Sequence, residues 1–324
     1  MGFNRENYKR IKEEYEGKYL RAREAAEMRK EEVHAAVEEV GRIDAELSAV
    51  GLRIMECAMK NDLNMLESVK KRNRELLDIR KELLVRAGYP EDYTEVRYEC
   101  PLCGDTGEVD NRMCVCMKKK LIEAGFETSG MSNLIEKQRF DNFSLEYYAK
   151  SPESFKRMTI IYKTLFKYAN EFDPKTSKNI AMFGPTGLGK THLSSAVARV
   201  VIEKGYDVYY SGALDMLSDF EYSRFKSGAG APGGGNTDRY YDCDLLIVDD
   251  LGTEVSNQFT TSCLYNIINT RLNKGRQTII STNLTQEEFR KRYWDRITSR
   301  VLGEYMILPF IGQDIRSQKL MKNN

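Results

Sequence analysis

The sequence predicts an α/β fold in which helices flank a parallel sheet, with a helical arm and a small cysteine-rich module placed before it. The first observation is a glycine-rich loop within residues 179–193, which follows an apolar run and precedes a helix-compatible stretch. The second is a pair of later apolar runs, 245–250 and 277–283, that end in polar side chains as buried parallel strands do. The third is a charged N-terminal segment with a helical apolar period. The expected parts are an arm at 1–95, a four-cysteine module at 96–120, a linker at 121–150 and the α/β domain at 151–324.

Length and charge limit the classes of protein to which the chain can belong. Its 324 residues suggest about two domains with enough material for a buried core. Lys and Arg number 50 and Asp and Glu number 49, so bulk charge favours neither nucleic-acid nor membrane binding. No apolar run approaches the roughly 20 residues of a membrane span, and residues 1–6 lack the apolar core of a signal peptide. We expect a cytoplasmic protein with no membrane partner.

The N-terminal segment carries a coiled-coil pattern. Apolar residues recur about every 3.5 positions, at Val33, Val37, Val40, Ile43, Leu47, Val50 and Ile54. A polar break at 60–62, with Asp62 as a cap, precedes a second helix that ends near Gly88. The pattern predicts a helical hairpin or short coiled coil. Two roles fit it: a surface that holds a partner or a second copy of the chain, and a solvated helical pair that only completes the fold.

Residues 184–191 read Gly-x-x-x-x-Gly-Lys-Thr, the pattern of a phosphate-binding loop between a strand and a helix. Its glycines let successive backbone N–H groups face the phosphates, and the next helix points the positive end of its dipole into the same pocket. Lys190 reaches the β- and γ-phosphates, and the Thr191 hydroxyl completes a magnesium shell. The candidate nucleotide-binding residues here are Gly184, Pro185, Thr186, Gly187, Leu188, Gly189, Lys190, Thr191 and His192. The sequence therefore predicts that the chain binds a nucleoside triphosphate with Mg²⁺.

Two carboxylates and an amide follow the later strands. Asp249 and Asp250 end an apolar strand about 58 residues after Lys190, and Asn283 ends the next one. Asp249 is suited to hold magnesium, and Asp250 to orient or activate the attacking water. Asn283 is placed to hydrogen-bond the γ-phosphate or that water.

Three arginines near the C-terminus are further candidates. Arg296 and Arg300 lie four residues apart on one helix face, and Arg316 follows in Gly-Gln-Asp-Ile-Arg. For each of them, a simple salt bridge is the alternative. Aromatic residues at 140–172 are either neighbours of an adenine ring or ordinary core.

The cysteine cluster predicts a structural zinc site. Ten residues separate Cys100 and Cys103 from Cys114 and Cys116. Four thiolates on two short turns close a tetrahedral shell and leave no position for water, so the Zn²⁺ is expected to be structural. A redox Cys-x-x-Cys is the alternative, but it leaves the second pair unexplained.

Together these motifs resemble the AAA+ ATPases, and more narrowly the bacterial helicase loaders of the DnaC/DnaI type, with the IstB transposition ATPases as relatives. The similarity covers roughly residues 140–320 and rests on GPTGLGKTHL, LLIVDDLG, ISTN, the paired arginines and GQDIR. The cysteine module ahead of the core is similar to the DnaI-like loaders and argues against IstB.

The resemblance implies a role for each motif residue. Lys190 and Thr191 would be Walker A residues, Asp249 and Asp250 Walker B, Asn283 sensor 1 and Arg316 sensor 2. Arg300, with Arg296 beside it, would be the finger that acts on ATP held by a neighbouring subunit, which implies self-association. Asp250 replaces the Glu of many AAA+ proteins, so slow, partner-regulated hydrolysis is expected, with Glu254 as a second candidate base.

The leading hypothesis is a loader that binds the replicative hexameric DNA helicase through the arm and zinc module and engages single-stranded DNA. The segment 220–241 mixes cations and aromatics as a strand-binding surface does, although a loose surface helix is an equal alternative. Its glycine-rich run at 227–236 is interpreted as a flexible excursion. Two other functions remain: an IstB-like transposition ATPase that binds duplex DNA, and an adaptor that binds ATP without turnover.

Overall fold

The structure is a computed structural model that describes residues 3–60, 62–131, 137–226 and 237–322. The glycine-rich run at 227–236 lies outside these residues. The chain forms two compact units, Arg10–Met117 and the combination of Met1–Lys9 with Lys118–Asn324. We call them the arm unit and the sheet unit. The domain boundaries expected from the sequence stay a proposal.

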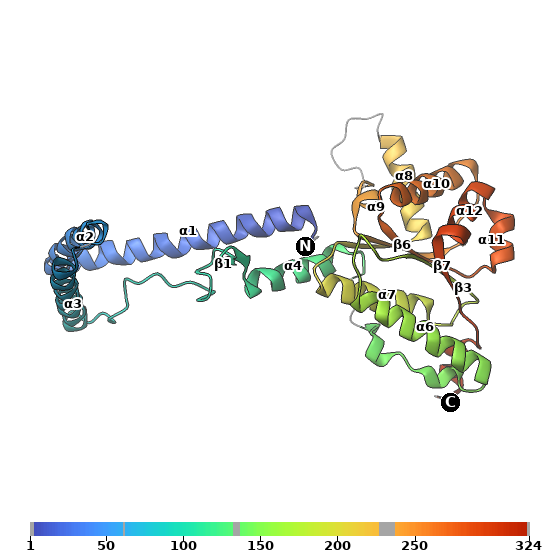
Figure 1. The fold of residues 1–324 in the computed structure, drawn as a ribbon, viewed down its shortest axis with the longest axis horizontal. Coiled ribbons are helices and arrows are strands. Elements are labelled where there is room, and N and C mark those ends of the chain that lie inside the picture. Colours follow the sequence, from blue (N-terminus) through green and yellow to red (C-terminus); the bar gives the residue numbers. More distant parts are fainter. Residues whose placement is uncertain (1–2, 61, 132–136, 227–236, 323–324) are drawn as a thin grey trace. The chain divides into compact units, whose positions relative to one another are not determined.

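The sheet unit is built on a five-stranded parallel sheet. Its strands are β3 (Asn179–Phe183), β4 (Val208–Gly212), β5 (Leu245–Leu251), β6 (Gln277–Thr282) and β7 (Tyr305–Pro309). They lie in the order β4, β5, β6, β3, β7 (Figure 1). The predicted α/β fold class is thereby confirmed. The edge strand β7 was not predicted, because it is short, half-buried and ends in a proline.

The register brings the ends of three strands together. Phe183 at the end of β3 pairs with Thr282 of β6, and Gly212 of β4 pairs with Asp249 of β5. Between Val248 and Leu251 the pairing of β5 with β6 is irregular, so two acidic residues leave the regular ladder. The polar residues that follow β3, β5 and β6 therefore meet at one edge of the sheet.

Helices cover both faces of the sheet (Figure 1). Ile180 and Met182 of β3 belong to one hydrophobic cluster, and Ala181 and Phe183 belong to the other, as the two-residue period of a strand requires. The first cluster includes residues of α6 (Pro152–Asn170) and α7 (Lys190–Glu203). The second includes residues of α8 (Ala213–Lys226), α9 (Arg239–Asp242), α10 (Gln258–Asn273), α11 (Gln286–Arg292) and α12 (Asp295–Glu304). Among the described residues, no helix combines the length and apolar character needed to cross a bilayer.

The stretch expected to be a linker at 121–150 contributes to the core of the sheet unit. It contains the end of α4 (Val115–Thr128) and two short 3₁₀ helices, η1 (Phe140–Asn142) and η2 (Leu145–Tyr148). Phe140 and Tyr148 are buried in the first hydrophobic cluster. The Tyr148 hydroxyl donates to the carbonyl of Leu188 at 2.8 Å, which ties this stretch directly to the glycine-rich loop.

The arm unit has three long helices where the sequence predicted two. They are α1 (Arg5–Ala36), α2 (Glu38–Met59) and α3 (Leu63–Arg86). The prediction of one helix through residues 33–54 was wrong at Val37, whose backbone is not helical (φ −135°, ψ 87°). Val33 before this break and Val40 after it pack together against Leu84 of α3, so the same apolar period continues across a bend. Two short strands, β1 (Glu108–Val109) and β2 (Arg112–Met113), follow in this unit.

The hairpin of α2 and α3 is confirmed, as is the cap at Asp62, whose side chain accepts from the backbone N–H of Met65 at 3.1 Å. Asp44 Oδ1 of α2 accepts from Arg80 Nε of α3 at 2.6 Å, and Asp44 Oδ2 lies 2.7 Å from His34 Nε2 of α1. Burial disfavours the charged carboxylate, but the bonds from Arg80 and His34 prevail and hold the pKa of Asp44 below its usual value. One carboxylate thus links all three helices.

Replacing Asp44 by Ala should loosen the hairpin, because Arg80, whose side chain is only 14% exposed, would lose its carboxylate partner. We expect α2 and α3 to lose about 2–3 kcal/mol of local stability. The measurement is faster amide hydrogen exchange of these helices in the full-length protein. Glu46→Ala is the matched control, since it removes an exposed pair with Arg72 and should cost less than about 1 kcal/mol. Equal effects of the two variants would contradict this assignment.

Candidate functional site

The glycine-rich loop between β3 and α7 needs glycine where other chain segments approach it. Gly187 has φ 74°, and a Cβ there would lie 1.9 Å from Asp314 Oδ1. Gly184 has φ 142°, and a Cβ there would lie 2.3 Å from the carbonyl oxygen of Phe310. Gly189 has φ 77° and begins α7 as its N-cap. The loop is therefore fixed both by left-handed backbone and by close packing of the C-terminal segment.

Lys190 lies at the centre of this loop with its side chain directed inward. Its Nζ donates to the carbonyls of Gly184 at 2.6 Å and Pro185 at 2.8 Å, and to Asn283 Oδ1 at 2.8 Å. The residue is 4% exposed. Burial lowers the pKa of Lys190 to about 8, against the opposing effect of Asp250 and Asp249. An anion that entered the loop would therefore meet a cation whose charge is poorly solvated.

Asp249 is buried behind the loop and accepts from three side chains. Thr191 Oγ1 donates to its Oδ2 at 2.9 Å, and the Tyr210 hydroxyl donates to the same oxygen at 2.6 Å. The Ser281 hydroxyl donates to Oδ1. Burial, and then the neighbouring Asp249 carboxylate, raises the pKa of Tyr210. These bonds fix the carboxylate in one orientation beside the hydroxyl of Thr191.

Asp250 differs from Asp249 in exposure and backbone. Its φ is 53°, a left-handed value that aspartate tolerates. Its side chain lines the cavity and accepts from Asn283 Nδ2 at 3.3 Å. Burial raises the pKa of Asp250, and the nearby Asp249 carboxylate raises it further. Asn283 thus contacts both Lys190 and Asp250, through its two amide ends.

These groups surround a cavity of about 350 Å³ in the sheet unit. It is lined by nine of the residues predicted from the sequence, namely Thr186, Gly187, Gly189, Lys190, Thr191, His192, Asp250, Asn283 and Arg316. Gly184, Pro185, Leu188 and Asp249 support it from behind, through their carbonyls or, for Asp249, the bond to Thr191. The structure therefore gathers one set of motifs from separate strands into one site.

The aromatic stretch at 140–172, whose role the sequence left open between base neighbour and core, contributes to the cavity. Phe143 and Tyr147 line it, and the ring of Phe143 meets that of His192 edge to face at 5.2 Å. Of the aromatic residues whose role was left open, Phe140 and Tyr168 are core. Lys319 also lines the cavity, on α13 (Ile315–Lys322).

The C-terminal segment that carries Arg316 is attached to the loop by backbone bonds. The N–H of Ile315 donates to the carbonyl of Gly187 at 3.0 Å. Gln318 donates to the carbonyl of Tyr147 at 3.3 Å. The helix that presents Arg316 and Lys319 is therefore attached directly to the loop at Gly187.

Arg300 does not line this cavity. Its guanidinium on α12 is held by Asn269 Oδ1 at 3.0 Å and lies over the ring of Tyr265 at 4.9 Å. Arg296 is exposed on the same helix. Glu254, considered as a second base, is 4% exposed and accepts from Gly252 N at 2.7 Å and from the Tyr293 hydroxyl. It is a buried structural carboxylate that does not line the cavity, so that candidate role was wrong.

In the arm unit, the four cysteines converge. The Sγ atoms of Cys100, Cys103, Cys114 and Cys116 all lie within 4.8 Å of one another. Those of Cys103 and Cys116 are 3.6 Å apart, close to the roughly 3.8 Å edge of a tetrahedron with 2.3 Å zinc–sulfur bonds. Hydrogen bonding to the backbone lowers the pKa of Cys100 to about 7. The donor set and its spacing fit a zinc ion.

The turn before the first pair is held by a buried side chain. Asp105 accepts from the backbone N–H of Glu99 at 2.8 Å and of Cys100 at 2.7 Å, and it is 2% exposed. Gly107 has φ 77°, and a Cβ there would lie 2.7 Å from Met117 Sδ. The cysteine turns are therefore fixed by their own side chains and backbone.

The proposed strand-binding segment at 220–241 is partly buried. Tyr240 is 1% exposed and donates to Asp219 at 2.6 Å. Arg239 pairs with Asp207 at 2.8 Å and lies 4.5 Å from the centre of the Tyr209 ring. These two residues belong to the core and its edge, so their assignment to a strand-binding surface was wrong. Residues 227–236 lie outside the described residues.

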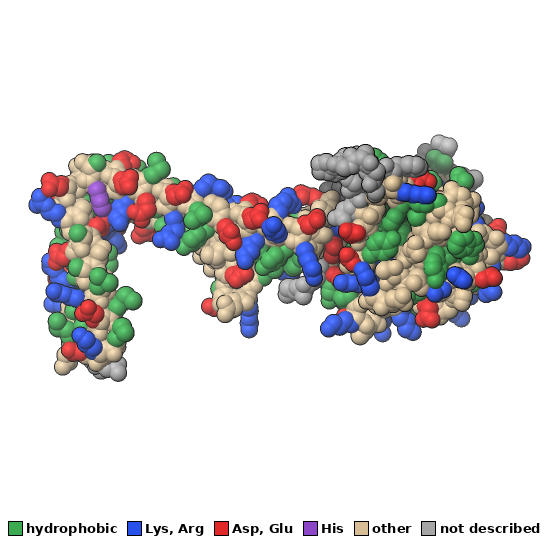
Figure 2. Space-filling view, turned by 90° about the horizontal axis from the view of Figure 1, so that it is seen from above, with side chains coloured by type: hydrophobic (Ala, Val, Ile, Leu, Met, Phe, Trp, Pro, Cys, Tyr) green, Lys and Arg blue, Asp and Glu red, His purple; other side chains and the backbone are tan. Residues whose placement is uncertain are grey.

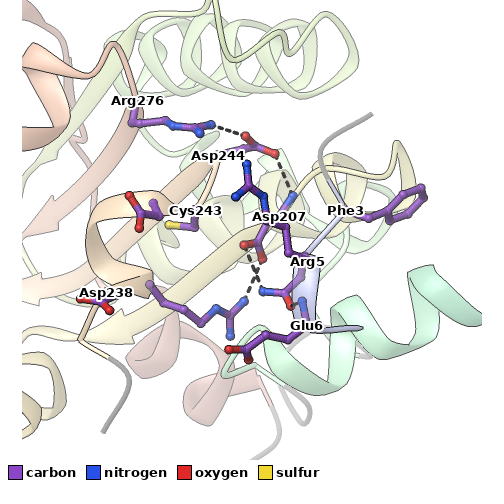
Figure 3. Close-up of a pocket in the computed structure, with 11 residues that line it drawn as sticks. Phe3, Arg5, Glu6, Asp207, Asp238, Cys243, Asp244 and Arg276 are labelled. Carbon is purple, nitrogen blue, oxygen red and sulfur yellow. Dashed lines mark hydrogen bonds and ion pairs between the residues drawn. The ribbon is translucent and has the colours of Figure 1, made fainter. Parts of the chain in front are cut away.

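A second cavity of about 590 Å³ lies at the amino ends of β4 and β5 (Figure 3). Its charged groups largely pair with one another: Asp244 pairs with Arg276 at 2.5 Å, and Asp207 pairs with Arg239 at 2.8 Å. Phe3 packs on Gly205, where a Cβ would lie 2.7 Å from its ring. We interpret this cavity as the place where the first described residues attach to the sheet unit.

Comparison with known proteins identifies related sequences. Residues 169–311 match the family model described as IstB-like ATP binding protein. The replicative helicase loader DnaC of Buchnera aphidicola subsp. Baizongia pistaciae is 26% identical over 194 residues, which cover 59% of this chain and 74% of the relative. DnaC of Escherichia coli K12 is 26% identical over 197 residues, or 60% and 75% of the two chains. The crystal structure of the DnaC helicase loader gives a TM-score of 0.46 at 20% identity over 55% of this chain and 98% of that one.

The resemblance expected from the sequence is thereby confirmed: the chain is similar to the replicative helicase loaders of the DnaC type, and its residues 169–311 match the IstB-like ATP-binding family.

Proposed function

We propose that the protein is an ATP-dependent loader that binds the replicative hexameric DNA helicase in the cytoplasm and helps to place it on single-stranded DNA. One observation carries the proposal: the similarity to DnaC loaders extends over about three-quarters of their length, and the chain gathers its phosphate-loop and acidic motifs around one cavity. The IstB-like match alone also fits a transposition ATPase. The four-cysteine module favours the loader.

The cavity supplies each group that ATP binding requires. Lys190 exchanges its bonds to backbone carbonyls for phosphate oxygens, and Arg316 and Lys319 add positive charge from α13. Thr191 and Asp249 would hold Mg²⁺, which neutralises phosphate charge when bound, and their oxygens already lie 2.9 Å apart. Phe143 and Tyr147 offer aromatic surface to the base.

The position of the candidate base supports slow hydrolysis. Asp250 is one methylene shorter than glutamate, and Asn283 holds it through a long 3.3 Å bond. Its raised pKa makes it a better proton acceptor than an ordinary aspartate. We propose that ATP mainly controls a conformational state, with turnover set by the partner.

Self-association would complete the site. Arg300 lies outside the cavity of its own chain, yet Asn269 and Tyr265 hold its guanidinium in place. Because Arg300 is held in place and lies away from the nucleotide site of its own chain, it is suited to act as an arginine finger on the ATP of a neighbouring subunit. The arm unit, with zinc held by the four cysteines, would bind the helicase.

The loader proposal is tested by retention of the purified replicative helicase of the same cell on immobilised full-length protein. We expect the hexamer to be retained, and ATP with the protein to transfer it to circular single-stranded DNA. Lys190→Ala should keep retention but lose transfer, because it removes the phosphate contact of the loop. Failure to retain the helicase, together with tighter binding of duplex DNA and a transposase, would replace the loader with the IstB-like alternative.

Arg300→Ala should reduce the ATPase rate of the assembled protein by about a thousandfold, while ATP affinity stays within about twofold because Arg300 does not line its own cavity. Mixing Arg300→Ala with Lys190→Ala should restore part of the rate, since each chain supplies what the other lacks. Arg296→Ala is the matched control. If Arg296→Ala abolishes the rate and Arg300→Ala does not, Arg296 is the finger. A wild-type protein that binds ATP but never hydrolyses it, with helicase or DNA present, would support the adaptor.

The purified protein should contain about one zinc ion per chain, because four thiolates close one tetrahedral shell. Cys103→Ser should lose the metal and expose the module to proteolysis near residues 96–120. Cys263→Ser, outside the cluster, should keep the metal content unchanged. Metal analysis and limited proteolysis are the measurements. A metal-free wild type that instead forms a reversible disulfide would support the redox alternative.

A further inference from the structure

Helix α2 has two apolar seams on opposite sides. One seam faces α3 and contains Val40, Ile43, Leu47, Val50, Ile54 and Cys57. The other consists of Gly41, Ala45, Ser48, Leu52, Met55 and Met59, which recur with alternating steps of four and three residues. At 100° per residue these positions fall on the face opposite the first seam. We call this second set the outer seam.

The outer seam is exposed and carries no charge. Leu52, Met55 and Met59 are 66%, 65% and 87% exposed, and Ala45 and Ser48 are exposed as well. Gly41 is half-buried beside the ring of His34. Hydrophobic side chains lie between charged ones on the surface of this hairpin (Figure 2). An uncharged heptad stripe on an otherwise highly charged helix is typical of a helix-packing surface.

The order of side-chain sizes along the outer seam identifies its occupant. The amino-terminal half has small residues, and the carboxy-terminal half has large ones. When a second α2 lies antiparallel with its centre at Val50, Ala45 faces Met55 and Ser48 faces Leu52 of the other copy, and Met59 reaches the end of the seam where the His34 ring lies against Gly41. In both facing pairs a large side chain then meets a small one, which is the arrangement that fills a helix interface without overpacking. This self-complementarity favours a second copy of α2, because a surface that binds an unrelated helix need not be complementary to itself in the reversed direction.

Charges beside the seam agree with the same arrangement. In an antiparallel pair of helices, residues on one flank of the seam face the same flank of the other copy. On the first flank, the facing positions are symmetric about Ala49. Arg42 then faces Glu56 of the second copy, and Glu56 faces the other Arg42. On the opposite flank, Asp44 faces Ala58, and Gly51 faces itself. The pairing brings no like charges together, and the glycines at the axis permit close approach.

We propose that the outer seam of α2 is an interface between two copies of this chain, packed antiparallel about a two-fold axis near Val50. The seam is six positions long, so the contact lies at the small end of specific interfaces, and the dimer forms at micromolar concentration. This self-association differs from the one that places Arg300 at a neighbouring nucleotide, because it uses only the arm unit and needs no ATP.

The first test is sedimentation equilibrium of the full-length, nucleotide-free protein between about 1 and 100 μM. We expect a monomer–dimer equilibrium that Leu52→Glu weakens at least tenfold, because it would place a charge against Ser48 in each half of the seam. Met28→Glu is the matched control, since Met28 of α1 is 70% exposed and lies outside the seam. Circular dichroism should show unchanged helicity in both variants. A wild-type monomer across this range, or a dimer that Leu52→Glu does not weaken, would overturn the proposal.

The second test fixes the direction of the helices by maleimide crosslinking. Two Ala49→Cys thiols would lie beside the axis and crosslink, whereas two Arg42→Cys thiols would be about 21 Å apart along the helices and would not. The unmodified chain gives the background from its native cysteines. Efficient crosslinking of both variants indicates a parallel pair and overturns the proposal. Loss of helicase retention by Leu52→Glu, with a wild type that stays monomeric, would assign the seam to the helicase and also overturn it.

Discussion

The nucleotide site depends on the burial of one ammonium group. Lys190 lies almost entirely out of water, so its charge must be balanced by oxygen atoms at every stage. In the structure, two carbonyls of the loop and the amide of Asn283 provide them. Phosphate oxygens would compete directly with these three acceptors. In the proposed function, nucleotide binding would exchange the partners of Lys190 and release Asn283, which also donates to Asp250.

The same exchange links the nucleotide to the rest of the sheet. Asn283 follows β6, Asp249 and Asp250 end β5, and Lys190 follows β3, so one ligand contacts the ends of three strands. The irregular pairing between β5 and β6 separates the two acids. Asp249 is fixed by three hydroxyls, whereas Asp250 has one long bond and faces the cavity. In the proposed function, this arrangement would give magnesium a rigid ligand in Asp249 and leave Asp250, the candidate base, less constrained.

The sequence predicted the sheet and most of the loop residues because each strand carries its own signal. An apolar run followed by a glycine-rich loop, an acid pair or an amide is local information, and parallel topology places the three ends together. The edge strand β7 and the break at Val37 were not predicted from the sequence, because both depend on tertiary packing. Val37 continues the heptad, and only the packing of Val33 and Val40 against Leu84 requires a bend there. Lys319 was not predicted for the same reason, since the fold alone brings it to the cavity, and only the fold shows that Phe143 and Tyr147 of the aromatic stretch line it.

Periodicity also explains the second, exposed row of uncharged residues on α2. A helix of 22 residues with one apolar face needs one neighbour, and α3 meets that need. The outer seam of α2 is a second face at the same period, which a hairpin of two helices leaves in water. Its residues are uncharged although the arm is rich in Lys, Arg, Asp and Glu, and solubility alone would favour charge there. In the proposed dimer, α2 would lie between α3 of its own chain and α2 of the second copy.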